Sequence, residues 1–228
     1  MNEQNARMQA MFDGVAPRYD CLNHVLSAGI DRDWRRRAIA MLDLKAGERV
    51  LDLCAGTGDL GFAALDREPR LSVVGIDLAR AMLARGERKK QNRPYTFLQG
   101  NAEELPFPDA SFDAAAVGFG IRNVGERVQA FREVARVLRS HGRLAVLEFT
   151  VPTREPLRRL YLAYFRHVLP RLGGWVSGRP EAYRYLPESV STFPAPGALA
   201  RELEDAGFTR VRWQLLSGGI AALHLAGR

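Results

Sequence analysis

Residues 49–61 read RVLDLCAGTGDLG, and this stretch decides the fold. Residues 49–54 have the pattern of a strand, residues 55–58 form the turn AGTG, and residues 59–66 have a helical pattern. Glycines at such a turn let a ligand approach the backbone where a strand passes into a helix. We therefore expect this stretch to belong to a parallel α/β sheet.

The chain alternates short β-type runs with helical patterns up to residue 150 and then adds a helix and a hairpin. The periodicity predicts further strands at residues 71–77, 95–99, 112–118 and 143–149, and helices at residues 79–91, 127–138 and 196–205. Two last β-runs, 209–216 and 220–225, are joined by the hairpin-type turn Ser217-Gly218-Gly219. Gly142 is expected to mark the end of the preceding helix. The predicted fold class is α/β, a seven-stranded and mostly parallel sheet with a C-terminal antiparallel hairpin and helices on both faces.

Composition excludes several other classes of protein. The 228 residues are 46% hydrophobic and 26% charged, which is ordinary for a globular domain. The two cysteines and four histidines lack metal-ligand spacing, so we expect neither a disulfide framework nor a metal site. The longest apolar run, residues 114–121, is far shorter than the roughly 20 residues of a membrane span. Without a signal-peptide pattern the chain is predicted to be cytoplasmic, with contact to the inner face of the cell membrane left open.

Acidic residues surround the glycine turn and indicate which ligand it takes. Gly56, Thr57 and Gly58 lie between Asp52 in the strand and Asp59 in the helix, and Asp77 ends the next strand. A carboxylate at the position of Asp77 can accept hydrogen bonds from both hydroxyls of a ribose. A dinucleotide site needs a third glycine at a fixed spacing, and Gly61 does not have that spacing. The negative charge of Asp59 would also lie where the pyrophosphate binds. The turn therefore fits the sulfonium of S-adenosylmethionine better than NAD.

Asn101 and Ala102 follow the third predicted strand, at the sheet edge where open α/β sheets bind ligands. The amide of Asn101 can hydrogen-bond the edge of an adenine ring. Taken alone, an asparagine there also fits an ordinary cap in a loop. Together with Asp77 and the glycine turn, both residues are predicted to contact the cofactor.

We expect a single domain, residues 1–228, with two segments added to its core. Its parts are an N-terminal helical lid at 1–45, a cofactor-binding core at 46–150, an inserted segment at 151–190, and the last helix and hairpin at 191–228. The inserted segment carries seven arginines against three acids, in a chain of net charge +7. No nucleic-acid-binding pattern accompanies this charge, so nucleic acid is not an expected partner. Apolar residues recur at helical spacing from Leu157 to Leu169, which fits either a helix packed on the sheet or an amphipathic lid.

Three motifs resemble those of a known family. They are residues 19–34, YDCLNHVLSAGIDRDW, residues 118–124, GFGIRNV, and residues 136–150, RVLRSHGRLAVLEFT. They are similar to the patterns of the ubiquinone/menaquinone biosynthesis C-methyltransferases, a family of class I S-adenosylmethionine-dependent methyltransferases with a Rossmann-like fold. The chain departs from the family pattern at Leu22, usually Met, at Asp31, usually His, and at Ser140-His141, usually Pro-Gly. The resemblance covers nearly the whole chain.

The resemblance implies methyl transfer from S-adenosylmethionine to a ring carbon of a polyprenyl quinol. Arg122 and Asn123 match the family's Arg-Asn pair. A guanidinium stays protonated, so Arg122 is expected to stabilise a phenolate, with Asn123 orienting the quinol; an arginine that only closes the pocket through an ion pair is the alternative. In the N-terminal motif Asp20 is a candidate base and Tyr19 a partner of the ring, although both residues, like His24, also fit lid packing.

These motifs do not determine which ring is methylated, because family members that act on benzoquinols and members that act on naphthoquinols share them. In the family, the ubiquinone-pathway and dual-use members often have a longer N-terminal extension than this chain, which favours demethylmenaquinol as the substrate. A benzoquinol substrate and a non-catalytic cofactor-binding domain are the alternatives. For such substrates, residues 151–190 are predicted to admit the isoprenoid tail and to touch anionic lipid. A homodimer remains open.

Overall fold

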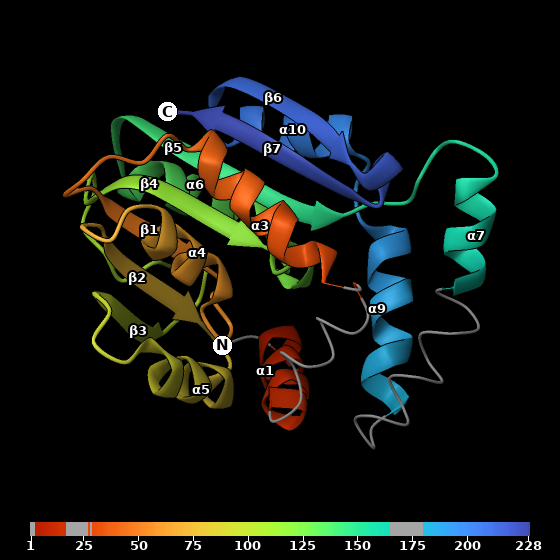
Figure 1. Cartoon of the computed structure of the whole chain (residues 1–228), viewed down its shortest axis with the longest axis horizontal. Coiled ribbons are helices and arrows are strands. Elements are labelled where there is room, and N and C mark those ends of the chain that lie inside the picture. Colours follow the sequence, from red (N-terminus) through yellow and green to blue (C-terminus); the bar gives the residue numbers. More distant parts are fainter. Residues whose placement is uncertain (1–2, 17–26, 28, 165–179) are drawn as a thin grey trace.

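The computed structural model describes residues 3–16, 27, 29–164 and 180–228. A seven-stranded sheet with the order β3-β2-β1-β4-β5-β7-β6 forms its centre (Figure 1). The strands are β1 (Arg49–Leu53), β2 (Ser72–Asp77), β3 (Tyr95–Gln99), β4 (Phe112–Gly118), β5 (Leu138–Phe149), β6 (Thr209–Leu216) and β7 (Ala221–Gly227). Neighbouring strands from β3 to β5 are parallel, whereas β7 is antiparallel to both β5 and β6. The predicted fold class is confirmed.

Helices cover both faces of the sheet. They are α1 (Glu3–Val15), α3 (Ile30–Met41), α4 (Asp59–Arg67), α5 (Arg80–Lys90), α6 (Arg127–Val137), α7 (Leu157–Ala163), α9 (Pro180–Thr192) and α10 (Pro196–Asp205), with short 3-10 turns η2 (Ile121–Asn123) and η4 (Ser217–Gly219). Side chains of α3 and α4 pack in one core layer, and those of α6 and α10 pack in the other. Figure 1 shows α7 and α9 beyond the end of the sheet and α1 below it.

The central strands are buried on both faces, which explains why their sequences are mostly apolar. Successive residues of β1 point to opposite sides, so that Val50 packs with α3 and α4 while Leu51 packs with α6 and α10. Asp52 is the polar exception in this strand and is 2% exposed. A carboxylate at that depth needs hydrogen-bond donors, and these donors define part of the site described below.

The strand order reverses direction between β1 and β4, because β2 and β3 extend to one side of β1 and β5 and β7 to the other side of β4. Ligands of open α/β sheets bind at such a switch point, outside the carboxyl ends of the strands. The ends of β1, β2 and β4 therefore position the site.

Two boundaries differ from those expected. β5 begins at Leu138, and Gly142 lies inside this strand instead of ending a helix. Leu138 pairs with Phe112 and the next pair is Arg143 with Ala114, so the intervening residues bulge out of the ladder. The helix expected from Leu157 is described only to Ala163, since residues 165–179 lie outside the described part. Within the described residues, no helix combines the length and apolar character that crossing a membrane requires.

Candidate functional site

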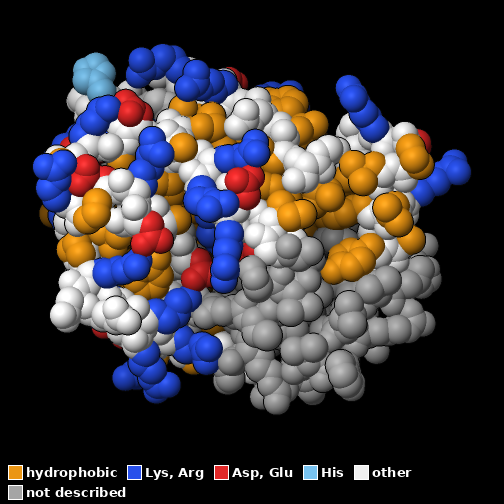
Figure 2. Space-filling view, viewed as in Figure 1, with side chains coloured by type: hydrophobic (Ala, Val, Ile, Leu, Met, Phe, Trp, Pro, Cys, Tyr) orange, Lys and Arg blue, Asp and Glu red, His pale blue; other side chains and the backbone are white. Residues whose placement is uncertain are grey.

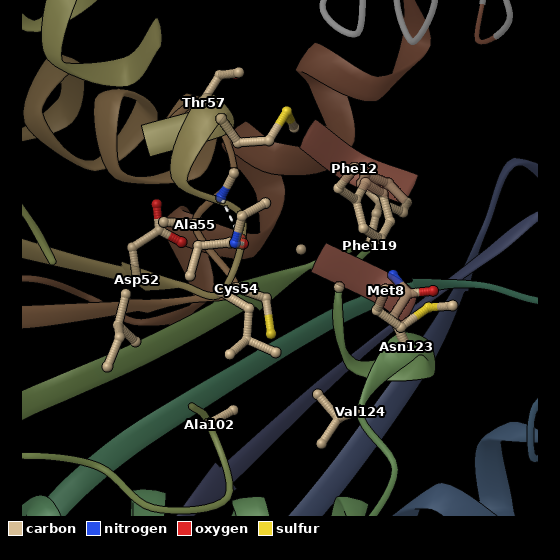
Figure 3. Close-up of a pocket in the computed structure, with 18 of the residues that line it drawn as sticks. Met8, Phe12, Asp52, Cys54, Ala55, Thr57, Ala102, Phe119, Asn123 and Val124 are labelled. Atoms are coloured by element: carbon tan, nitrogen blue, oxygen red, sulfur yellow. Dashed lines mark hydrogen bonds between the residues drawn. The ribbon is translucent and has the colours of Figure 1, made fainter. Parts of the chain in front are cut away.

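A cleft lies at the carboxyl ends of β1, β2 and β4 and is covered by α1 (Figure 3). Its walls leave about 920 Å³ of empty space, open solvent included. Met8 and Phe12 line it from α1, together with Phe119, which directly follows β4, and Asn123 of η2. All seven predicted cofactor contacts lie on or beside this cleft, namely Asp52, Gly56, Thr57, Gly58, Asp77, Asn101 and Ala102, although Gly58 is not among its lining residues.

The glycine turn owes its shape to left-handed backbone conformations. Gly58 has φ +86° and precedes the first residue of α4, and a Cβ there would lie 2.7 Å from the ring of Phe97. Both the conformation and the close approach thus require glycine. The turn presents its backbone to the cleft between Asp52 and Asp77.

Asp77 shapes the turn as well as facing the cleft. Its carboxylate accepts hydrogen bonds from the backbone N–H of Gly56 and from that of Ala79, each at 2.8 Å. Each oxygen makes one of these bonds and retains capacity for another, because a carboxylate oxygen has two lone pairs. Burial raises the pKa of Asp77, opposed by these two backbone N–H groups. The residue can therefore accept a diol from the cleft while it supports the loop.

Asp52 is held by donors that come from two other elements. The hydroxyl of Tyr95 donates to its Oδ2 at 2.5 Å, and the N–H of Gly61 donates to the same oxygen at 2.9 Å. A Cβ at Gly61 would lie 2.5 Å from the Tyr95 ring, so Gly61 is the residue that lets this ring reach Asp52. This contact explains why Gly61 is a glycine although it does not have the spacing of a dinucleotide site. Burial raises the pKa of Asp52 to about 7, although the Tyr95 hydrogen bond lowers it.

Removing the Tyr95 hydroxyl should therefore have a pH-dependent effect. Tyr95→Phe is expected to lower the free energy of unfolding by roughly 1–3 kcal/mol at pH 8, because ionised Asp52 loses a donor. Folded Asp52 keeps its proton to about pH 7, well above the unfolded value near 4, so its contribution to stability falls as pH rises through this window. The loss should be smaller at pH 6, where Asp52 is protonated. Urea titrations at both pH values measure it, and an equal loss at both would indicate altered packing alone.

Asp59 does not face the cleft as an isolated negative charge, contrary to the expectation. Lys89 of α5 lies 2.6 Å from its carboxylate and also donates to Thr57 Oγ1 at 3.0 Å. The basic end of α5 thus reaches across to the glycine turn. The preference for a cationic ligand consequently depends on Asp52 and Asp77 and not on Asp59.

Asn101 and Ala102 follow β3 on the wall of the cleft. Asn101 Oδ1 accepts the N–H of Glu103 at 3.1 Å, and its Nδ2 donates to the Glu103 carboxylate at 3.3 Å. The same carboxylate accepts Asn5 of α1 at 3.3 Å. Asn101 is therefore both a loop-forming residue and a cleft residue, which combines the two interpretations of the sequence.

The side chains of Arg122 and Asn123 point in different directions, although the two residues are adjacent in η2. Asn123 lines the cleft, and its Oδ1 accepts the hydroxyl of Tyr185 from α9 at 2.9 Å. The Arg122 side chain turns to the other side, where Nη1 donates to Glu148 Oε1 at 2.8 Å and to the carbonyl of Phe119. Glu148 is 1% exposed and the Arg122 side chain 7% exposed. We call Arg122, Asn123, Glu148 and Tyr185 the η2 cluster.

The η2 cluster combines groups of both charges in a buried setting. Burial raises the pKa of Glu148 while Arg122 opposes this, and burial also raises the pKa of the Tyr185 phenol. Nε of Arg122 is buried and has no hydrogen-bond partner among the residues the structure describes. The cluster therefore offers an uncommitted cationic donor beside a carboxylate.

Sequence reasoning assigned no role to Glu148, Tyr95, Lys89 or Arg35. Glu148 is an acid at the end of the apolar run RLAVLEF, and that contrast was an available signal. The other three depend on contacts between distant segments. Tyr19 and Asp20, proposed from the first motif, lie outside the described residues, as does His24.

Solved structures with similar backbones include S-adenosylmethionine-dependent methyltransferases. A SAM-dependent methyltransferase from Thermotoga maritima, a possible histamine N-methyltransferase, has a TM-score of 0.67 at 19% identity, covering 96% of this chain and 98% of that one. The [4+2]-cyclase SpnF has a TM-score of 0.70 at 18% identity, covering 97% and 94%. The fold is that of the class I methyltransferases, and the cyclase illustrates that fold alone does not decide chemistry.

The model of the ubiE/COQ5 methyltransferase family matches residues 1–228. A demethylmenaquinone methyltransferase from Thermus thermophilus is 49% identical over 220 residues, which are 96% of this chain and 100% of that protein. A ubiquinone/menaquinone biosynthesis C-methyltransferase UbiE from Syntrophotalea carbinolica is 47% identical over 216 residues, covering 94% and 91%. The chain belongs to the ubiE/COQ5 methyltransferase family, and the resemblance inferred from the three motifs is confirmed.

Proposed function

We propose that this chain methylates a ring carbon of a polyprenyl quinol with S-adenosylmethionine as the donor, converting a demethylmenaquinol into a menaquinol. The observation that carries the proposal is the η2 cluster next to the cleft, with Asn123 belonging to both. The names and identities of both family members above support the reaction class, and the name of the Thermus thermophilus relative supports this substrate.

The cleft residues suit the cofactor. The glycine turn leaves backbone exposed where a side chain would fill the space, Asp77 retains acceptor capacity for a ribose diol, and Asp52 offers a carboxyl group deeper in the cleft. Asp52, Gly56, Thr57, Gly58, Asp77, Asn101 and Ala102 are the proposed cofactor residues. Bound there, S-adenosylmethionine supplies an electrophilic methyl group on a sulfonium.

The chain's own residues then have to make the ring nucleophilic and aim it. Loss of a phenolic proton raises the electron density at the ring carbon, which forms the new C–C bond as the C–S bond breaks and later releases its own proton. Arg122 keeps its charge and is proposed to stabilise the phenolate through hydrogen bonds. Asn123 would orient the hydroxyl, with Tyr19 as a ring partner and Asp20 as a candidate base.

A paired methylation assay tests the proposal. Purified protein is given S-adenosylmethionine and either a short-chain demethylmenaquinol or the corresponding benzoquinol precursor, and the methylated products are quantified. We expect turnover of the naphthoquinol. Turnover of the benzoquinol alone would shift the assignment to the ubiquinone pathway, whereas cofactor binding without turnover of either would support a non-catalytic cofactor-binding domain.

We further propose that α7 contacts the membrane from which so apolar a substrate must be taken. Leu160 is 69% exposed and Leu162 39% exposed, whereas Tyr161 between them is buried against Val190. The apolar residues of α7 therefore do not form the single stripe that was expected, because Tyr161 faces the core whereas Leu160 and Leu162 face solvent. Figure 2 shows apolar and basic side chains together over this end of the molecule.

Reversing the charge of Arg158 and Arg159 should weaken binding to anionic vesicles. An arginine near such a surface contributes about 1 kcal/mol, and salt screens the attraction. We expect Arg158→Glu/Arg159→Glu to reduce vesicle cosedimentation at low salt while activity on a short-chain quinol persists. Arg36→Glu/Arg37→Glu on α3 is the matched control, because it makes the same change of charge at exposed positions. Equal losses in the two variants would contradict docking through α7.

A further inference from the structure

Arg35 of α3 is a buried cation on the wall of the cofactor cleft. Its side chain is 10% exposed, and its guanidinium lies 5.5 Å from the centroid of the Phe119 ring. Among the cleft-lining residues that the structure describes, it is the single lysine or arginine. A buried arginine beside an open cleft calls for an explanation, because its charge loses solvation there.

Asp31 fixes the direction of this arginine. One turn earlier on α3, the Asp31 carboxylate accepts a hydrogen bond from Arg35 Nη1, and its other oxygen accepts Ser27 Oγ at 2.6 Å. Arg35 Nη2 lies 3.9 Å from the Asp59 carboxylate, beyond hydrogen-bond distance. Asp31 stands where the family pattern has histidine, and here it provides a fixed charge that a neutral imidazole would not.

The charges of the cleft match the two ends of an amino acid. Asp52 offers a carboxylate and Arg35 offers a guanidinium, both on the wall of the same cleft. An amino-acid group carries an ammonium and a carboxylate, which need partners of opposite sign. Guanidinium is well suited to the carboxylate because its N–H donors form a fork.

We propose that Arg35, positioned by Asp31, binds the α-carboxylate of the amino-acid part of S-adenosylmethionine. This assignment depends on the proposed cofactor and deepens it to a named counter-ion. Asp31 acts through Arg35 and is a positioning residue.

Two ligands that differ only in this carboxylate test the proposal. Calorimetry compares S-adenosylmethionine with decarboxylated S-adenosylmethionine on the purified parent protein and on Arg35→Ala. A charge-assisted hydrogen bond corresponds to roughly 10- to 150-fold in affinity. We expect the parent to prefer the carboxylated ligand by about this factor, and Arg35→Ala to lose that preference while its affinity for the decarboxylated ligand stays nearly unchanged.

Two further variants separate recognition from folding. Arg36→Ala, one residue along α3 and 73% exposed, should keep the parent's preference. Asp31→Asn/Arg35→Gln removes both charges, so no buried ion is left alone, and it should lose the preference as Arg35→Ala does.

A parent that binds both ligands equally, or an Arg35→Ala variant that loses both equally, would overturn the assignment. A parent that shows the preference but methylates no quinol would leave the carboxylate site intact and refute only the proposed reaction.

Discussion

Asp77→Ala is expected to weaken binding of S-adenosylhomocysteine by roughly 30- to 150-fold, or about 2–3 kcal/mol. Two causes act together. The variant loses the acceptors for the ribose diol, and it also releases the N–H groups of Gly56 and Ala79, which hold the glycine turn and the start of α5. Isothermal titration calorimetry measures the affinity, and thermal unfolding reports whether the turn has loosened the fold.

Asp66→Ala provides the control. Asp66 lies in α4, its side chain is 64% exposed, and its partner is Arg93 at 2.8 Å. Such a surface pair contributes roughly 0–1 kcal/mol, so this variant should bind the ligand as the parent does. Unchanged affinity in Asp77→Ala would refute the ribose assignment.

Arg122→Ala should lower kcat by roughly 10²- to 10³-fold while the affinity for the cofactor stays close to that of the parent. Arg122 is hydrogen-bonded to Glu148 and does not line the cofactor cleft, so in the proposed reaction its loss removes a donor from the quinol and leaves the cofactor contacts in place. Steady-state kinetics with both substrates varied separates kcat from the two KM values. A change confined to the cofactor KM would make Arg122 a binding residue.

Stability must be separated from catalysis in this experiment. Removing Arg122 leaves Glu148 buried without its counter-ion, which costs roughly 3–5 kcal/mol. Arg122→Gln/Glu148→Gln removes both charges and should recover most of that stability. If the double variant is stable and still slow, the guanidinium acts in the reaction; if it is stable and fast, the pair has only a structural role.

The secondary structure was largely predictable because it depends on local periodicity. The run from Arg49 and the helix from Pro196 have patterns that only one kind of element satisfies, and both form as expected. The start of β5 was not predictable, since Leu138 joins the ladder through a distant partner, Phe112. A bulge of this kind leaves no periodic signal.

The candidate site also has one part that local sequence predicts and another that depends on contacts between distant segments. The glycine turn and Asp77 could be found from spacing alone, because strand ends of a parallel sheet converge at one edge. The donors that hold Asp52 could not, since Tyr95 is far away in the sequence and reaches it only because Gly61 leaves room. The direction of Arg122 also depends on packing, as nothing local selects Glu148 over the cleft.

The short turn η2 places neighbouring residues on opposite sides of one wall, with Asn123 toward the cofactor cleft and Arg122 toward Glu148. A 3-10 turn advances about 120° per residue, so inserting or deleting a single residue would rotate both side chains away from their present partners. Chain length, as well as residue identity, is consequently under constraint in this segment. The bulge at residues 139–142 has no such constraint from the cleft, because none of its residues lines it. Natural variation in loop length should therefore collect at that bulge and be absent from residues 121–123.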